Sequence, residues 1–373
     1  MIRFLTGGES HGKGLVGIID GIPANLNVDI DYINKELARR QKGYGRSSRM
    51  SIEKDEIEIL SGVNNFLTMG SPISIVIENK GRNIDLIEVT KPRPGHGDLI
   101  GALKFNQDGG RNILERASAR ETAMRVAIGG FSKLLLREFN VEILSHVINI
   151  GGIKSNNSYY YSTGYISLNN CDESDLRVID SNAEIFMIEK IKDAIEAGNT
   201  LGGTIEIIIR NLPIGLGSHT SWDLKLDGLL SQALFSIPGI KAVEFGKGVE
   251  VADIPGDKLH DEIIYENGYK RKTNNAGGIE AGISNGEDIV IKIHMKPIPT
   301  LKKPLATIDM ITKKKATALA ERSDVCAVPA ASIVGEAMVA YILANEFMRK
   351  FGGDSMEEMK NNYISYKDYI KTR

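Results

Sequence analysis

Cysteine is nearly absent from this chain. Among its 373 residues only Cys171 and Cys326 occur, and they lie far apart in the sequence. Secreted domains that depend on disulfides are rich in cysteine, so this usage favours a protein of a reducing cytosol over a disulfide scaffold. Residues 1–6 also lack the charged region and apolar core of a secretory signal, and we therefore expect a cytoplasmic location.

Long apolar runs and an excess of positive charge are missing as well. Residues 332–347 come closest to the length of a membrane span, but Glu336 interrupts them. The 46 basic and 48 acidic residues give a net charge of −2, whereas a general nucleic-acid binder normally carries a basic excess. Trp222 is the single tryptophan, and few aromatic residues lie near the arginines, which disfavours stacking on bases. We expect neither a membrane nor a nucleic acid as a partner.

The sequence does contain both hydrophobic periods of regular structure. Alternation typical of strands occurs in residues 15–20, 56–60, 73–78, 204–210 and 289–295. Helical patterns occur in residues 31–42, 118–139, 185–197, 222–236 and 332–351. Because turns separate the strands as often as helices do, the pattern predicts an α+β fold and not regular βαβ units. No exact repeat or low-complexity linker is present, so we predict one domain over residues 1–373, although the length allows up to three.

Residues 111–125 combine a helix-start signal with four arginines. Ser118 followed by Glu121 is typical of a capping box, which would place a helix N-terminus here with outward-facing N–H groups. Those donors and the helix dipole attract phosphate or carboxylate. The segment therefore indicates an anion site formed with Arg111, Arg116, Arg120 and Arg125. An ordinary solvated amphipathic helix is the alternative that this segment alone leaves open.

Two further segments carry arginines next to glycines. Arg39 and Arg40 fall in the last turn of the predicted helix 31–42, which should end at Gly43, and the following loop adds Arg46 and Arg49. Arg39 and Arg40 could also serve only to complement the helix C-terminus. The loop Arg93-Pro94-Gly95-His96-Gly97-Asp98 displays three functional side-chain types on a stiffened backbone.

Six segments, in order, resemble the motifs of the chorismate synthase family. They are Gly8-Glu9-Ser10-His11-Gly12, Arg39-Arg40-Gln41-Lys42-Gly43-Tyr44-Gly45-Arg46, Arg93-Pro94-Gly95-His96-Gly97-Asp98, Ser118-Ala119-Arg120-Glu121-Thr122, Met295-Lys296-Pro297-Ile298-Pro299-Thr300 and Glu321-Arg322-Ser323-Asp324. The resemblance runs from residue 1 to about residue 349. It implies a β-α-β sandwich, with core helices between two antiparallel sheets, and a homotetramer; periodicity alone indicates neither.

The resemblance also implies a reaction. The family converts 5-enolpyruvylshikimate 3-phosphate to chorismate by 1,4-anti elimination of phosphate, using reduced FMN although the net reaction is redox-neutral. NADPH is a candidate reductant of the flavin, and an external flavin reductase is a candidate partner. The substrate carries two carboxylates and a phosphate, which planar guanidinium groups suit. Motif matching assigns substrate binding to Arg40, Arg46, Arg49, Arg93 and Arg120.

Catalytic roles follow from the same resemblance. His11, beside Ser10, suits the acid that assists the leaving phosphate. The resemblance places His96 near the flavin N1 region and Asp324 near flavin N5, where the C6 proton departs. A loop histidine held by backbone groups, and a capping or surface carboxylate, are the simpler alternatives for His11 and Asp324. The histidines without motif support are interpreted as structural: His146, His219, His260 and His294.

Flavin contacts complete the implied site. The family's FMN-contacting positions match Arg116, Ala117, Ser118, Pro238, Gly239, Ala281, Lys296, Pro297, Ile298, Pro299, Thr300 and Arg322. Ala281 stands where a glycine is usual, Pro238 and Gly239 replace another stretch, and residues 78–92 are shorter than in many relatives, which would trim a lid. An NAD(P)H-dependent flavin reductase is the alternative enzyme, although it would not need this many oxyanion-binding arginines.

Overall fold

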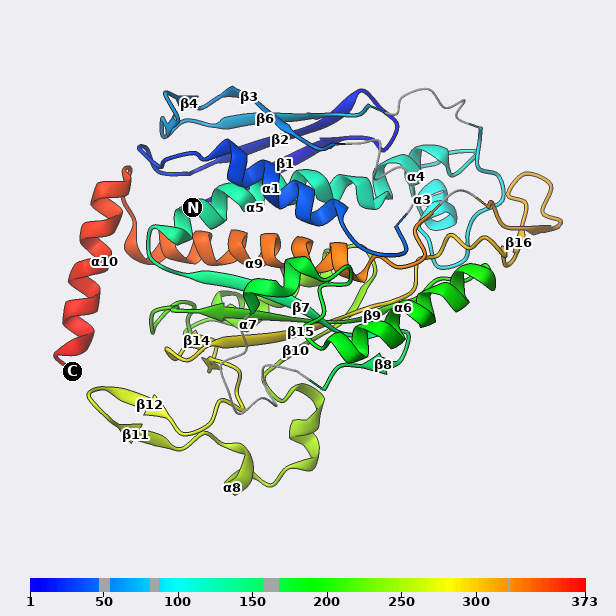
Figure 1. Cartoon of the computed structure of the whole chain (residues 1–373). Coiled ribbons are helices and arrows are strands. Elements are labelled where there is room, and N and C mark those ends of the chain that lie inside the picture. Colours follow the sequence, from blue (N-terminus) through cyan, green and yellow to red (C-terminus); the bar gives the residue numbers. More distant parts are fainter. Residues whose placement is uncertain (47–53, 81–86, 157–167, 321–322) are drawn as a thin grey trace.

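Two antiparallel sheets enclose a layer of helices in the computed structural model, which describes residues 1–46, 54–80, 87–156, 168–320 and 323–373 (Figure 1). The first sheet has the order β1 (Arg3–Gly8), β2 (Gly14–Asp20), β6 (Ile73–Glu78), β3 (Ile57–Ser61). The second has the order β10 (Ile240–Phe245), β15 (Ile289–Met295), β9 (Gly203–Arg210), β7 (Glu142–Ile150), β8 (Ile153–Lys154). Between them lie α1 (Ile30–Gln41), α5 (Thr122–Arg137) and α9 (Val328–Phe351). The predicted α+β sandwich is confirmed.

The two sheets differ in how much of each strand is covered. In β2, Leu15 and Ile19 are buried while Val16 and Ile18 are exposed, so one face of this sheet meets the helices. In β9 every residue from Thr204 to Arg210 is buried, because other parts of the chain cover both faces. Glycine allows the close approach of the first sheet to α5: a Cβ on Gly17 would lie 2.5 Å from the sulfur of Met124.

The central helix α9 is the core of the sandwich. It crosses α5 closely, since a Cβ on Gly129 would lie 2.4 Å from the Cβ of Ala337. Among the helices of the described ranges, α9 is long and apolar enough to cross a membrane, but 83% of that stretch is buried inside the fold. A helix that is apolar on all sides is typical of a protein core, and α9 is a core helix.

The predicted helix 118–139 is wrong in its first turn. Ser118 has an extended backbone (φ −61°, ψ 141°) and separates α4 (Arg111–Ala117) from a 3-10 turn at Ala119–Glu121 and from α5. The Ser118 hydroxyl accepts a hydrogen bond from the Arg120 N–H at 3.3 Å. The Glu121 carboxylate does not complete a capping box, because it pairs with Arg125 Nε at 2.7 Å. The ion pair one turn along the helix competes successfully for this carboxylate.

Other helix starts also differ from the sequence prediction. α6 (Ser181–Glu196) begins four residues early because Asp180 caps its N-H groups, and α9 begins at Val328 with Pro329 in its first turn. Residues 222–236 divide into a 3-10 turn at Trp222–Leu224 and α7 (Leu226–Phe235). The sequence prediction missed α3 (Asp98–Lys104), α4, α10 (Met356–Lys371), β1, β7 and β10.

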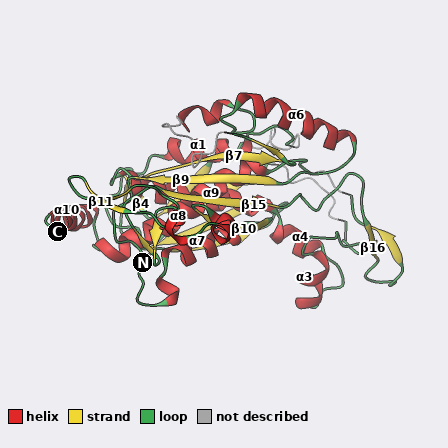
Figure 2. Ribbon diagram, turned by 90° about the horizontal axis from the view of Figure 1, so that it is seen from below, coloured by secondary structure: helices red, strands yellow, loops and turns green. Residues whose placement is uncertain are grey.

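The smaller elements lie at opposite ends of the sandwich. Figure 2 shows α3, α4 and the hairpin of β16 (Ala306–Ile308) and β17 (Lys315–Thr317) at one end. α10 and the hairpin of β11 (Ile263–Tyr265) and β12 (Tyr269–Arg271) lie at the other. The first of these ends also holds the C-terminus of α1 and the N-terminus of α9 (Figure 1). Most of the candidate site residues come from this end.

Candidate active site

His11 is held by a carboxylate from α4. In the loop between β1 and β2, its Nδ1 lies 2.9 Å from Glu115 Oε1, and its backbone N–H donates to Glu115 Oε2 at 2.8 Å. Burial by itself would raise the pKa of Glu115, but the hydrogen bonds from His11 and the charge of Arg111 lower it. Glu115 is therefore an ionised acceptor, so Nδ1 of His11 carries the proton.

Two serines adjoin His11. The Ser118 hydroxyl donates to the Ser10 hydroxyl at 3.2 Å, and the Ser10 N–H donates to the Glu115 carbonyl at 3.0 Å. Nearby, Arg116 donates to the carbonyls of Thr6 and Gly8 at the end of β1. The loop that carries Ser10 and His11 is thus joined to α4 at several points.

Arg40 and Arg120 share one buried carboxylate. Asp55 accepts from Arg120 Nη1 at 2.6 Å with one oxygen and from Arg40 Nη2 at 3.2 Å with the other. Arg46 pairs with Asp324 at 3.3 Å. Burial and the charges of Arg46 and Arg120 lower the pKa of Arg40 to about 10, although Asp55 opposes them.

Three guanidinium groups, those of Arg40, Arg46 and Arg120, form the group that we call the arginine cluster. Arg40 is buried, and its two cluster neighbours add positive charge around it. A buried positive charge that other positive charges surround is costly unless an anion joins it. The cluster is therefore suited to a multiply charged anion.

His96 belongs to a second group of side chains. Its Nδ1 lies 2.6 Å from Asp98 Oδ1, and Arg93 binds the same carboxylate through Nε at 2.8 Å and Nη2 at 2.9 Å. Arg93 Nη1 donates to the Thr300 hydroxyl at 2.6 Å. Burial would raise the pKa of Asp98, but the hydrogen bonds from His96 and Arg93 hold it well below its usual range. Two guanidinium nitrogens of Arg93 are thus engaged with Asp98. The predicted contact of Arg93 with substrate stays a prediction.

The loop after β15 lies beside His96. Lys296 donates to the Gly95 carbonyl through its ammonium group and to the Gly239 carbonyl through its backbone N–H, the latter at 2.9 Å. Gly239 has φ +90°, a conformation that favours glycine, at the turn after α7. Burial and the neighbouring charge of Lys241 lower the pKa of Lys296. An anion bound between the two ammonium groups would relieve their repulsion.

The two groups of side chains are neighbours. Ser323 donates to the Thr300 carbonyl at 2.8 Å, and the next residue, Asp324, pairs with Arg46 of the arginine cluster. Gly110, which precedes α4, packs on Asp98, since a Cβ there would lie 3.1 Å from the Asp98 Cβ. The residues that the structure brings together from the predicted site are Ser10, His11, Arg40, Arg46, Arg93, His96, Arg116, Ala117, Ser118, Arg120, Pro238, Gly239, Lys296, Pro297, Ile298, Pro299, Thr300 and Asp324.

Ala281 is not brought to this site within the chain. It lies in the turn between β13 (Ile279–Glu280) and β14 (Ile283–Ser284), where Gly282 accepts from the first N–H of α7. Gly239 follows the other end of α7, and a helix of ten residues spans about 15 Å. Two other predicted site residues, Arg49 and Arg322, lie outside the described residues.

Sequence reasoning missed the carboxylates that hold these groups. Glu115 and Asp55 carry no motif of their own and lie 104 and 65 residues from His11 and Arg120. The one local signal was the spacing of Arg111 and Glu115 on a helix, which is typical of an ion pair and does not indicate a histidine. Asp98 lies in the motif Arg93-Pro94-Gly95-His96-Gly97-Asp98, but the motif predicted no role for its carboxylate.

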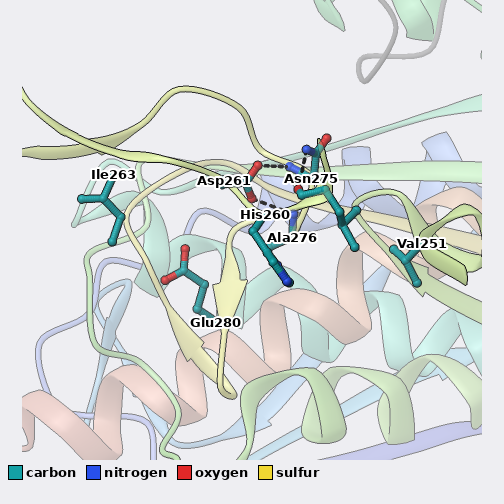
Figure 3. A pocket seen from close by; sticks show the side chains of 8 residues that line it. Val251, His260, Asp261, Ile263, Asn275, Ala276 and Glu280 are labelled. Atoms are coloured by element: carbon teal, nitrogen blue, oxygen red, sulfur yellow. Dashed lines mark hydrogen bonds between the residues drawn. The ribbon is translucent and has the colours of Figure 1, made fainter. Parts of the chain in front are cut away.

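The remaining histidines lie elsewhere. His146 is fully buried and pairs with Glu206 at 2.9 Å across β7 and β9, and His294 pairs with Glu244 at 2.9 Å. His260 lines the pocket of about 240 Å³ in Figure 3, on the excursion between β10 and β15. In that pocket Asp261 accepts from the N–H groups of Asn275 and Ala276 and so closes a turn.

Comparisons with known proteins identify the family of this chain. The family model described as chorismate synthase matches residues 2–348. The chorismate synthase of Alkaliphilus metalliredigens is 52% identical over 98% of this chain and 99% of that protein. The chorismate synthase of Thermoanaerobacter pseudethanolicus is 52% identical over 99% of each. A solved structure described as "Crystal Structure of Chorismate Synthase" has a TM-score of 0.83 and 41% identity, and the match covers 100% of this chain and 99% of that one. The chain belongs to the chorismate synthase family, a family of lyases.

Proposed function

We propose that this protein eliminates phosphate from 5-enolpyruvylshikimate 3-phosphate in a 1,4-anti sense to give chorismate, with reduced FMN as cofactor. The observation that carries this proposal is that Arg46 and Arg120 add positive charge around the buried Arg40, and that Asn79 links Arg120 to the His11 loop. Membership of the family supports the reaction, and the two groups of side chains supply the residue types that it needs. We expect a cytoplasmic homotetramer.

The arginine cluster suits the substrate because the substrate is a trianion or more. Each of Arg40, Arg46 and Arg120 presents a planar fork, and oxyanions accept two parallel hydrogen bonds from such a fork. Bound phosphate and carboxylate would also offset the repulsion that lowers the pKa of Arg40. Arg49 and Arg93 are proposed as additional contacts.

His11 is proposed as the proton donor. As the C3–O bond breaks, its electron pair leaves with the phosphate, which gains negative charge. The ionised Glu115 accepts from Nδ1 of His11 and orients the ring, and the other ring nitrogen is the one proposed to give a proton to the departing oxygen. Ser10 and Ser118 would hold the loop and the phosphate oxygens in place.

Asp324 is proposed as the acceptor of the proton that leaves C6. Its ion pair with Arg46 holds the carboxylate at the edge of the arginine cluster, next to the Thr300 backbone that Ser323 binds. Loss of the C6 proton and of the C3 phosphate together create the second ring double bond. Both changes then occur at one site, with the acid and the base on different sides of the cluster.

The second group of side chains fits a flavin phosphate and ring. Lys296 and Lys241 repel one another, and an anionic group would relieve that repulsion. Nδ1 of His96 faces Asp98, so its other ring nitrogen is the one proposed to face the flavin ring. Reduced FMN supplies a regenerable electron donor, which suits a redox-neutral elimination. The proposed contacts are Arg116, Ala117, Ser118, Pro238, Gly239, Lys296 to Thr300, and Arg322, with NADPH or an external reductase as the source of electrons.

Anaerobic turnover tests the proposal. Purified protein is mixed with chemically reduced FMN and 5-enolpyruvylshikimate 3-phosphate, and chorismate absorbance and inorganic phosphate are followed together. We expect equal amounts of both products, and none with oxidised FMN alone. Oxidation of NADPH without substrate, together with no release of phosphate, would instead identify a flavin reductase.

A further inference from the structure

Asn79 is a fully buried amide directly after β6, and neither the sequence motifs nor the proposed reaction assign it a role. Its Nδ2 donates to the Glu9 carbonyl at 3.0 Å and to the Gly12 carbonyl at 2.9 Å. Its Oδ1 accepts from Arg120 Nε at 2.9 Å. Both donors of the amide, and its oxygen, are therefore used.

These three hydrogen bonds join two parts of the candidate site. Glu9 and Gly12 flank Ser10 and His11, so the amide closes the loop around the proposed acid. The bond to Arg120 Nε fixes the plane of that guanidinium, and Asp55 then holds its Nη1 at 2.6 Å. A single side chain thus sets the distance between the proposed proton donor and an arginine of the cluster.

We propose that Asn79 is a positioning residue for the elimination: it places His11 relative to Arg120 so that the proton donor meets a phosphate held by the arginine cluster. The inference rests on the proposed function. Its physical basis is that a misplacement of about 1 Å in a catalytic group lowers a rate roughly 10²-fold. A carboxylate at this position has the same shape but no N–H donors, so it would repel both carbonyls while attracting Arg120.

The main variant is Asn79→Asp, with Asn274→Asp as its matched control. Asn274 also bridges backbone groups, with Nδ2 to the Asp288 carbonyl at 2.7 Å and Oδ1 to the Gly278 N–H at 2.7 Å, but outside the site. We expect Asn79→Asp to lower kcat by about 10²-fold and to raise KM, and Asn274→Asp to change neither. Asp55→Asn, which touches the arginines and not the histidine loop, should act mainly on KM.

A second comparison separates positioning from general destabilisation. In a His11→Ala background, Asn79→Asp should lower kcat little further, because the group that it positions is gone. A full additional loss of about 10²-fold in that background would overturn the inference, and so would an unchanged kcat in Asn79→Asp. If Asn79→Asp shows no thermal unfolding transition, Asn79→Ala is used in the same cycle with the same expectations.

A readout without turnover distinguishes this inference from the proposed reaction. Inorganic phosphate binding by calorimetry reports on the arginine cluster, and the His11 imidazole resonance reports on the loop. We expect Asn79→Asp to change both and Asp55→Asn to change only phosphate binding. If wild-type protein releases no phosphate from substrate but Asn79→Asp changes both readouts, the reaction is wrong and the link through Asn79 stands. If neither readout changes, the link is wrong whatever the turnover.

Discussion

Arg39 and Arg40 are adjacent on α1 and lie in opposite electrostatic surroundings. Arg39 points into a buried network around Glu336, at 2.9 Å, which also binds Lys133 at 2.6 Å and Arg177 at 3.1 Å. Glu36 pairs with Arg39 and Lys133, and Asp172 with Arg39 and Arg177. The three cations of this core network therefore meet three carboxylates. Arg40 lies in the arginine cluster, where the charges of Arg46 and Arg120 lower its pKa.

The pKa directions express this contrast. Burial alone would lower the pKa of Arg39, but Glu336 and Glu36 raise it above the usual value. Burial lowers the pKa of Arg40 to about 10, and Arg46 and Arg120 add to the decrease. Balanced buried charges hold the helices and sheet of a core together, whereas unbalanced ones suit a ligand of opposite charge. Each of the following measurements tests that distinction.

The largest effect should come from Glu336→Ala. The substitution leaves three buried cations with fewer partners, and breaking such a pair costs about 3–5 kcal/mol of unfolding free energy. Urea denaturation followed by circular dichroism measures the loss. Inorganic phosphate should not restore it, because the Glu336 side chain is fully buried in the core.

The pH dependence of Glu336 provides the control. Burial would raise its pKa, but Arg39, Lys133 and Arg177 hold it well below the usual range. A carboxylate with a lowered pKa stabilises the fold above its unfolded value of about 4.3 and loses that contribution as pH falls through the folded value. The difference between wild type and variant should therefore be constant from pH 6 to 8 and shrink in acid. A difference that vanishes near neutral pH would contradict the ionised form.

Asp324→Asn should lower turnover by about 10²-fold or more with little change in stability. Asparagine keeps an oxygen acceptor for Arg46 at the same place, but it cannot take the C6 proton. A substrate deuterated at C6 should show a larger isotope effect in the variant, because proton departure becomes more rate-limiting. Parallel loss of FMN binding and of melting temperature would make Asp324 structural, as Glu336 is.

Arg39→Met and Arg40→Met form a matched pair on one helix. Arg40→Met removes a charge that its neighbours disfavour, so the unfolding free energy should change by less than about 1 kcal/mol while substrate affinity falls by about 1.5–3 kcal/mol, or roughly 10–100-fold. Arg39→Met should do the reverse, with a clear loss of stability because Glu336 and Glu36 lose a partner. Equal loss of stability in both variants would remove the distinction between the two regions.

The sequence predicted the fold best where hydrophobic alternation was strong. The predicted strands 73–78 and 289–295 match β6 and β15 to the residue. α10 was missed although it has a local start signal, since the Ser355 hydroxyl accepts from the Glu358 N–H. Ala24 also holds this start through backbone hydrogen bonds with Asp354 and Met356, which the sequence does not reveal. The start of α9 at Val328 was predicted four residues too late, because burial of its first residues in the core sets this start.

The candidate site was predictable only in part, for a related reason. Motifs identified His11, Arg40 and Arg120, because the short segments that carry the family resemblance include them. The side chains that orient them, Glu115 and Asp55, come from distant segments, and only the folded chain shows that they meet. The resemblance also grouped Ala281 with these residues, although it lies beyond the other end of α7 within this chain.

The smallest effect should be stabilisation of the free protein by inorganic phosphate. If the arginine cluster carries an uncompensated charge, phosphate at five times its Kd should add about 1 kcal/mol to the unfolding free energy, whereas sodium chloride at equal ionic strength should not. The gain should fade as pH rises toward about 10, where Arg40 loses its proton earlier than an ordinary arginine. Arg40→Met should reduce the gain, and Arg39→Met should keep it on a lower baseline. Scanning calorimetry measures all three proteins, and the same gain in Arg40→Met as in wild type would place the phosphate outside the arginine cluster.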